Sequence, residues 1–324
     1  MQTRQLGYSE LQLTTIGLGT WAMGGGGWQY GWGPQDDSDA IAAVLTALDK
    51  GINWIDTAAA YGLGHSEELV GKALKQTSHK PSIATKCGLL WDDKGQVINC
   101  LEPKSIRREC HASLKRLGID AIDLYQIHWP KPDHDIEHAW QEMAKLAEEG
   151  KVLYLGVSNF NLDQIMRVQN LHPLASLQPP YSMLHREVEN ELLDYCLQNN
   201  IGVIVYSPMQ KGLLTGKFTQ ERLAGLPLDD HRRRSPDFHD PQFTATLQLV
   251  DRLRPIAERN GKTLAQLVIA WVLRRTEVTA AIVGARSPAQ IAETAPAAQW
   301  NLSREDIDQI EQLLTKRLEK IKAK

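Results

Sequence analysis

The segment SDAIAAVLTALDKGINWID, residues 38–56, contains a pattern that repeats along the chain. Its first part carries apolar side chains at helical spacing, namely Ile41, Val44, Leu45 and Leu48. After Gly51 the chain changes to a short run of β-forming residues that ends at Asp56. The segment therefore predicts an amphipathic helix over residues 38–49, followed by a buried strand over residues 52–56.

The same alternation continues in both directions from this segment. Short apolar runs typical of strands occupy residues 15–19, 52–56, 82–85, 122–127, 154–157, 175–177, 202–206 and 280–283. Helical periodicity is found at residues 38–49, 66–75, 103–117, 136–149, 187–199, 262–275, 287–295 and 303–321. Strands that alternate with helices predict an α/β fold, and eight such units favour a closed (β/α)8 TIM barrel. Ser66 is the expected N-cap of the second helix.

Two features extend this barrel. Residues 4–13, with a turn at Gly7-Tyr8, predict an N-terminal β-hairpin that closes the barrel bottom. Residues 88–101 and 207–241 are too long to be simple connections. Both are expected as long loops at the C-terminal face, where barrel active sites lie. No Pro-, Gly- or Ser-rich linker interrupts the alternation, so residues 1–324 are expected to form a single barrel domain.

The composition is that of an ordinary soluble protein, with 42% hydrophobic residues, 23% charged residues and a formal net charge of -3. This charge favours neither nucleic acid nor a membrane as partner, and no apolar run approaches the roughly 20 residues of a membrane span. The basic run at residues 231–234 is flanked by aspartates and is expected to be a solvated loop, with an anion site as the alternative. The four cysteines lack the spacing of a zinc site, so we expect no metal. Four cysteines without a pairing pattern, in a chain of this size, are expected to be reduced thiols, which indicates a cytoplasmic protein.

Polar side chains stand where the predicted strands end. Asp56, Lys86 and His128 end the second, third and fourth strands, and Tyr61 follows Asp56 by five residues. A phenol is a weak acid with a pKa of about 10, and a nearby ammonium such as Lys86 is expected to lower it. Asp56 would keep Lys86 charged, and His128 would share a proton with the oxygen that Tyr61 protonates. Such a set suits protonation of an alkoxide that develops from a carbonyl.

Taken singly, each of these residues has an ordinary structural explanation. A strand-end Asp often caps the next turn, and a Tyr or His at such a place usually contributes to packing. Lys86 alone is equally consistent with a Schiff-base lysine or a buried ion pair. Their joint position at one face of a barrel is what favours a catalytic function, and spacing alone does not name the reaction.

The chain resembles the aldo-keto reductase family in this set of residues and in several further segments. Asp56-x4-Tyr61-Gly62, Lys86 and His128 match the catalytic tetrad of that family, with the expected residue at all four positions. Other similar segments are Gly156-Val157-Ser158-Asn159-Phe160, Gln178-Pro179-Pro180-Tyr181, Tyr206-Ser207-Pro208 and Gly212-Leu213-Leu214-Thr215-Gly216-Lys217. The resemblance implies that Tyr61 is the general acid, that Lys86 with Asp56 tunes it, and that His128 orients the substrate carbonyl.

The resemblance also implies a nicotinamide cofactor. Ser158, Asn159 and Gln178 would hold the carboxamide, Tyr206 would stack on the nicotinamide ring, and residues 207–217, with Ser207 and Lys217, would reach the pyrophosphate. After the last strand, further contacts are expected from Gly284, Arg286, Ser287, Gln290 and Glu293. Because a guanidinium suits phosphate geometry, Arg286 with Ser287 favours NADPH over NADH. Trp21 and Trp129 are the expected substrate-pocket residues. The run of four glycines at 24–27 lacks a dinucleotide fingerprint and is expected to be a flexible loop.

The expected activity is therefore NADPH-dependent reduction of small aldehydes and ketones to alcohols, in a monomer or weak homo-oligomer that binds neither nucleic acid nor a membrane. One alternative is a cofactor-sensing regulatory subunit resembling the β-subunits of potassium channels, with little turnover. A second alternative is an aldolase that forms a Schiff base on Lys86, which would leave the nicotinamide-binding residues unexplained.

Overall fold

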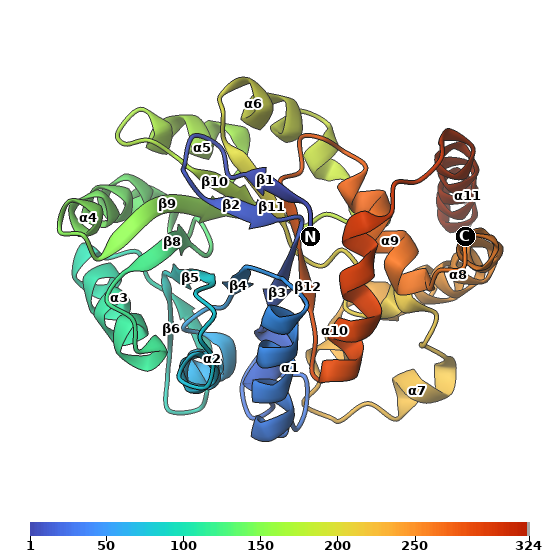
Figure 1. Ribbon diagram of the computed structural model, residues 1–324, viewed down its shortest axis with the longest axis horizontal. Coiled ribbons are helices and arrows are strands. Elements are labelled where there is room, and N and C mark those ends of the chain that lie inside the picture. The colour runs from blue at the N-terminus through green and yellow to red at the C-terminus, as the bar shows by residue number, and fades with distance from the viewer. Residues whose placement is uncertain (323–324) are drawn as a thin grey trace.

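The computed structural model describes residues 1–322, and within them eight parallel strands close into a barrel surrounded by helices (Figure 1). The barrel strands, in order around the barrel, are β3 (Ile16–Gly19), β4 (Trp54–Asp56), β5 (Ser82–Cys87), β8 (Ile122–Ile127), β9 (Val152–Ser158), β10 (Ser176–Gln178), β11 (Gly202–Val205) and β12 (Ala280–Gly284). Each strand pairs in parallel with the next, and β12 pairs with β3 to close the ring. The predicted (β/α)8 barrel is confirmed.

The helices on the outside of the barrel follow the predicted alternation closely. They are α1 (Asp37–Asp49), α2 (His65–Leu74), α3 (Pro103–Leu117), α4 (Ile136–Glu148), α5 (Leu162–Gln169), α6 (Leu192–Gln198), α9 (Leu264–Leu273) and α10 (Pro288–Thr294). Three more are α7 (Gln220–Ala224), α8 (Gln242–Arg259) and α11 (Arg304–Lys322). Figure 1 shows α11 beside α8, where Arg317 donates to Thr246. Each barrel strand thus packs its outer face against these helices, and the core of the protein lies between them.

Three helices were not predicted, namely α5, α8 and the five-residue helix α7 within the long 207–241 connection. The short helix α5 begins at a capping box, in which Asn161 accepts from the backbone of Gln164 while the Gln164 side chain accepts from the backbone of Asn161. The longer helix α8 contains Pro255, which normally counts against a helix interior. The prediction that Ser66 is the N-cap of α2 is also wrong. Gly64 holds that position, and the buried Ser66 hydroxyl donates to the backbone oxygen of Thr20.

The N-terminal hairpin is confirmed and closes the bottom of the barrel. Strands β1 (Thr3–Gln5) and β2 (Gln12–Thr14) are antiparallel and lie across the barrel opening in Figure 1. Leu6 and Leu13 pack against Trp54 inside the barrel. The Trp54 ring leaves no room beside Gly17, since a Cβ at that position would lie 2.1 Å from Cε2 of Trp54. A side chain on Gly17 would therefore displace the residue that fills this end of the barrel.

The two long connections are both structured. Residues 88–101 contain an antiparallel hairpin of β6 (Leu89–Trp91) and β7 (Val97–Asn99). Residues 207–241 contain α7 and several 3-10 turns, and they have an apolar cluster of their own that includes Phe218 and Phe238. Both segments lie at the C-terminal ends of the strands, as the sequence predicts. No helix in residues 1–322 has the length and apolar character that a membrane crossing requires.

Candidate active site

A cavity of about 870 Å³ opens at the C-terminal face of the barrel. Its size is in the upper part of the usual range of roughly 300–1,000 Å³ for ligand sites. The predicted site residues that line it are Trp21, Asp56, Tyr61, His128, Trp129, Ser158, Asn159, Gln178, Tyr206, Ser207, Lys217, Gly284, Arg286, Gln290 and Glu293. Two predicted residues do not line it: Lys86 is buried beneath Tyr61, and Ser287 is the N-cap of α10.

The catalytic candidates meet at the ends of β4 and β5. Nζ of Lys86 donates to Oδ2 of Asp56 over 2.7 Å, to the backbone oxygen of Thr57 over 2.9 Å and to the Tyr61 hydroxyl over 3.2 Å. The Asp56 carboxylate favours the protonated form of Lys86, which has no lone pair for attack on a carbonyl. This arrangement counts against the Schiff-base alternative and fits an ion pair that supports Tyr61.

A tight turn puts Tyr61 over this ion pair. Tyr61 begins a 3-10 turn in which Gly62 and Leu63 have left-handed backbone, with φ of 61° and 58°. Gly24 packs directly against this turn, and a Cβ on Gly24 would lie 2.6 Å from the backbone nitrogen of Gly62. The first glycine of the 24–27 run is therefore a packing residue beneath the turn that carries Tyr61.

The titration of Tyr61 differs from the sequence prediction. Burial raises the pKa of Tyr61 well above its usual value, and the nearby Asp56 carboxylate raises it further. The expectation that Lys86 lowers the pKa of Tyr61 is therefore wrong for this structure, because burial of the phenol disfavours the phenolate more strongly. Burial likewise lowers the pKa of Lys86, while Asp56 opposes that change. The geometry holds Tyr61 as a neutral phenol, which is the form that can donate a proton.

His128 lies beside Tyr61 at the end of β8. The two ring centroids are 5.7 Å apart, with the rings edge to face. Burial, and then the positive charge of Lys86, hold the pKa of His128 well below its usual value. The imidazole is therefore neutral, so one of its ring nitrogens is a hydrogen-bond donor and the other an acceptor.

Four polar residues form a connected network beside this group. The Tyr206 hydroxyl donates to Oδ1 of Asn159 over 2.7 Å, and Nδ2 of Asn159 donates to Oγ of Ser158 over 3.0 Å. Ser158 donates to the backbone oxygen of Gln178, whose Nε2 donates to Oδ1 of Asp56 over 2.8 Å. Within the described residues, Oε1 of Gln178 makes no hydrogen bond, so an amide acceptor at the cavity wall stays free.

The opposite end of the cavity is basic. The Arg286 guanidinium binds the 32–35 loop, with Nε donating to Oε1 of Gln35 over 2.6 Å and Nη1 to the backbone oxygen of Trp32 over 3.3 Å. Arg286 forms no ion pair with any carboxylate in the described part of the chain. Lys217, in contrast, lies 2.5 Å from Oε2 of Glu293. The two predicted cations therefore differ, because one has a carboxylate partner and the other does not.

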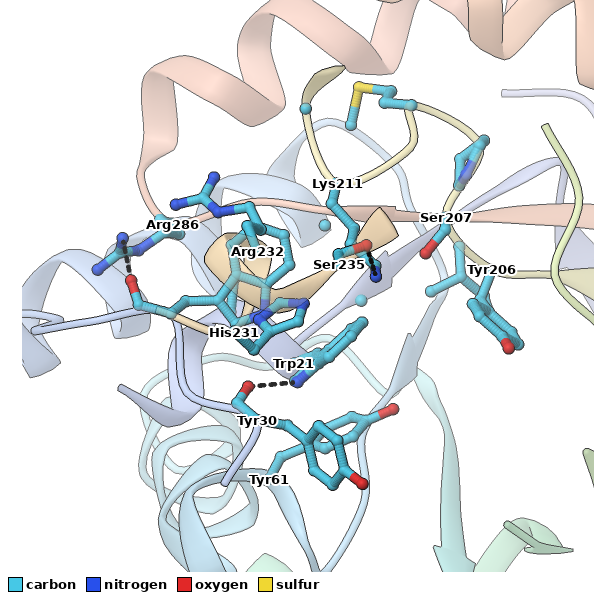
Figure 2. Close-up of a pocket in the computed structure, with 18 of the residues that line it drawn as sticks. Trp21, Tyr30, Tyr61, Tyr206, Ser207, Lys211, His231, Arg232, Ser235 and Arg286 are labelled. Carbon is cyan, nitrogen blue, oxygen red and sulfur yellow. Dashed lines mark hydrogen bonds between the residues drawn. The ribbon is translucent and has the colours of Figure 1, made fainter. Parts of the chain in front are cut away.

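The basic run at 231–234 is a correction to the sequence analysis. His231 and Arg232 are buried, at 6% and 7% exposure, and do not belong to a solvated loop. Arg232 forms an ion pair with Asp230 and lies over the Trp32 ring, 4.5 Å from its centroid. His231 packs on Trp21 with 4.7 Å between ring centroids (Figure 2). These residues form part of the cavity wall, and no local sequence signal indicated it.

The aromatic wall is only partly as predicted. Trp21 stacks near Tyr61 with 6.3 Å between centroids, and Trp129 lines the cavity while 39% exposed. Additional aromatic rings on this wall come from Trp28, Tyr30 and Trp32. The wall gathers large apolar surfaces around the Tyr61 hydroxyl, and such surfaces favour small organic substrates over highly charged ones at that point.

The model of the aldo/keto reductase family matches residues 15–315 of the chain. The chain belongs to the aldo/keto reductase family. It is 38% identical over 317 residues to the aldo-keto reductase YhdN of Bacillus subtilis, covering 97% of this chain and 94% of the relative. It is 37% identical over 320 residues to the NADH-specific methylglyoxal reductase of Escherichia coli, covering 94% and 96%.

The fold comparison agrees with this assignment. The glycerol dehydrogenase of Gluconobacter oxydans superposes with a TM-score of 0.88 at 38% identity, over 98% of this chain and 96% of that one. The chain is thus an oxidoreductase of the aldo/keto reductase family that acts on carbonyl groups with a nicotinamide cofactor.

Proposed function

We propose that this aldo/keto reductase reduces small aldehydes and ketones to alcohols with NADPH, and that Tyr61 is the proton donor. The observation that carries the proposal is the Asp56–Lys86–Tyr61 contact series at the floor of the cavity. The oxygen of Tyr61 accepts from Lys86, so the phenol hydrogen remains free to point toward a carbonyl oxygen. A neutral phenol in this position is a general acid.

The residues around the cavity fit a nicotinamide dinucleotide. Oε1 of Gln178 is a free acceptor beside Asp56, which suits the amide hydrogens of a carboxamide, and Tyr206 offers an aromatic face. We propose that Ser158 and Asn159 complete the carboxamide site. The predicted contacts of Ser207, Lys217, Gly284, Ser287, Gln290 and Glu293 belong to the same proposal.

When bound, NADPH would supply a hydride from C4 of its nicotinamide ring. The protein residues supply the proton and orient the carbonyl. Tyr61 gives its proton to the carbonyl oxygen, and Lys86 stabilises the phenolate that remains until solvent returns the proton. Neutral His128 donates to the same carbonyl oxygen and fixes its direction. The aromatic wall that includes Trp21 and Trp129 limits access of water to this point.

The preference for NADPH depends on Arg286. Its guanidinium has no carboxylate partner among the described residues, and planar guanidinium groups bind phosphate with two parallel hydrogen bonds. The Escherichia coli relative is NADH-specific, so the proposed preference depends on what Arg286 does in this chain. The unpaired charge on Arg286 supports the proposal that this residue binds the 2′-phosphate of NADPH.

The proposal is tested by mixing the purified protein with NADPH and a panel of small aldehydes and ketones, and following the absorbance of the reduced nicotinamide. NADH is run in parallel at the same concentrations. Loss of absorbance that requires both protein and carbonyl compound, and that is faster with NADPH, is the expected result. Tight NADPH binding without consumption for any carbonyl compound would contradict the proposed reaction.

A further inference from the structure

Glu67 is a buried carboxylate that the proposed reaction does not use. It lies in the first turn of α2, directly after the turn that carries Tyr61, and its side chain is 0% exposed. Oε1 of Glu67 accepts from the Thr85 hydroxyl over 2.6 Å, and Oε2 accepts from Nε of Arg116 over 2.6 Å. A carboxylate at such depth needs partners of this kind. Glu67 therefore links three elements, because it belongs to α2, Thr85 to β5 and Arg116 to α3.

The bond to Thr85 places this carboxylate near the ammonium of Lys86. Thr85 and Lys86 are consecutive residues of β5, so their side chains point to opposite faces of the strand. The Thr85 side chain points outward to α2, and that of Lys86 donates to Asp56 inside the barrel. The negative charge of Glu67 opposes the effect of burial on the pKa of Lys86. Glu67 thus influences Lys86 both through the strand that carries it and through its charge.

The turn that carries Tyr61 depends on where α2 lies. Leu63 in this turn has a φ of 58°, and a non-glycine residue in the left-handed region costs free energy that the surrounding contacts must offset. Two side chains hold the first turn of α2 in place. Ser66 donates to the backbone just after β3 over 3.1 Å, and Glu67 accepts from β5 over 2.6 Å. The Tyr61 turn is therefore held from its helical end, and Glu67 supplies the link to the strand that carries Lys86.

We propose that Glu67 is a positioning residue for the reduction, which holds the Tyr61 turn and Lys86 at the spacing in which the ammonium donates to the phenol oxygen. The inference rests on the proposed function, in which Tyr61 gives its proton to the carbonyl oxygen and Lys86 stabilises the phenolate that remains. The contact between them, at 3.2 Å, is near the long end of the range for a hydrogen bond. A small shift of α2 relative to β5 would therefore break it, and the bond between Thr85 and Glu67 opposes that shift.

Thr85→Val is the variant that tests this link, because it keeps the shape of the side chain and removes only the hydroxyl. Replacement of Glu67 itself would leave Arg116 without its carboxylate and would destabilise the fold. Thr85→Ser restores a hydroxyl at the same place, and Thr315→Val, at an exposed position on α11, is the matched control. Three quantities are measured for each protein: NADPH binding by tryptophan fluorescence, turnover of the best aldehyde as a function of pH, and the distance between the ammonium and the phenol oxygen in a crystal structure.

We expect Thr85→Val to lower turnover about tenfold while NADPH binding stays within about twofold of wild type, because a small misplacement of catalytic groups is costly for the reaction but not for the cofactor. With the ammonium farther away the pKa of Tyr61 rises, so the loss of turnover at alkaline pH moves to higher pH. Thr85→Ser recovers most of the turnover and the wild-type pH profile.

Three results would overturn the inference. One is a Thr85→Val protein with wild-type turnover. Another is a fall in turnover with an unchanged pH profile, which is the effect of a structural residue only. The third is a crystal structure of Thr85→Val in which Lys86 still donates to Tyr61 over the wild-type distance. This last measurement does not require activity, so it decides the inference even if the wild type reduces no aldehyde, a result that would contradict the proposed function instead.

Discussion

Asp56 and Lys86 form a buried ion pair, with 2.7 Å between Oδ2 and Nζ and with 2% and 1% of the two residues exposed. Asp56 also accepts from Gln178, through its other carboxylate oxygen. The pair therefore contacts Tyr61 through Lys86 and contacts Gln178, a residue proposed to hold the nicotinamide, through Asp56. Removal of either charge would leave the other buried without compensation.

Asp56→Asn is expected to lower both stability and turnover. Loss of one partner of a buried ion pair typically costs about 3–5 kcal/mol, and the pKa of Lys86 would fall further because Asp56 opposes the effect of burial. Denaturant unfolding and steady-state kinetics measure the two effects. Asp49→Asn, at an exposed position on α1, is the control. A stable Asp56→Asn protein with wild-type turnover would show that the pair does not support Tyr61.

Arg286→Ala is expected to weaken NADPH by about tenfold or more, and NADH far less, because only NADPH has a 2′-phosphate for the guanidinium. The control is Arg304→Ala, at an exposed site on α11. Direct binding of both dinucleotides measures the difference. Arg286 also holds the 32–35 loop through Gln35, so equal losses for NADPH and NADH would mean that its function is to hold this loop.

The stability of the protein should depend on pH through Glu109. Burial raises the pKa of this carboxyl to about 7, although it accepts from the backbone N–H of Gly88 and from Ser105. A folded-state pKa above the unfolded value means that the folded state binds more protons between the two values. The stabilisation is complete below the unfolded pKa and is lost as the pH rises through about 7.

Glu109→Gln removes this titration while keeping an acceptor for Gly88. Between about pH 5 and about pH 8, the wild type should lose up to about 3 kcal/mol of unfolding free energy relative to the variant. Denaturant titrations of both proteins at the two pH values provide the measurement. Parallel pH dependence in the two proteins would show that Glu109 does not titrate in this range.

Most of the barrel could be predicted because its signals are local. The strand at residues 122–127 has the predicted bounds, and α3 begins at Pro103 as expected. The proximity of Asp56, Tyr61, Lys86 and His128 could be predicted because the ends of neighbouring parallel strands meet at one edge of the barrel. The long helix α8 was missed because Pro255 interrupts its pattern, although Leu253 and Ile256 lie on its buried face.

What could not be predicted depends on contacts between distant segments. His231 is buried because it packs on Trp21 and lies within hydrogen-bond distance of the backbone oxygen of Gly31, both about 200 positions earlier in the chain. The difference between Arg286 and Lys217 depends on where Glu293 lies after folding. The pKa of Tyr61 depends on the extent of its burial, which outweighs the nearby Lys86 and which no spacing reveals.

The most direct test of the account is the turnover of Tyr61→Phe with NADPH and the best aldehyde substrate of the wild type. The variant keeps the ring and removes only the hydroxyl, so NADPH binding by fluorescence should stay close to wild type. The account predicts that turnover falls by about 100-fold or more, the usual contribution of a positioned general acid. Near-normal turnover by a protein that binds NADPH normally would contradict the assignment of Tyr61 as the proton donor.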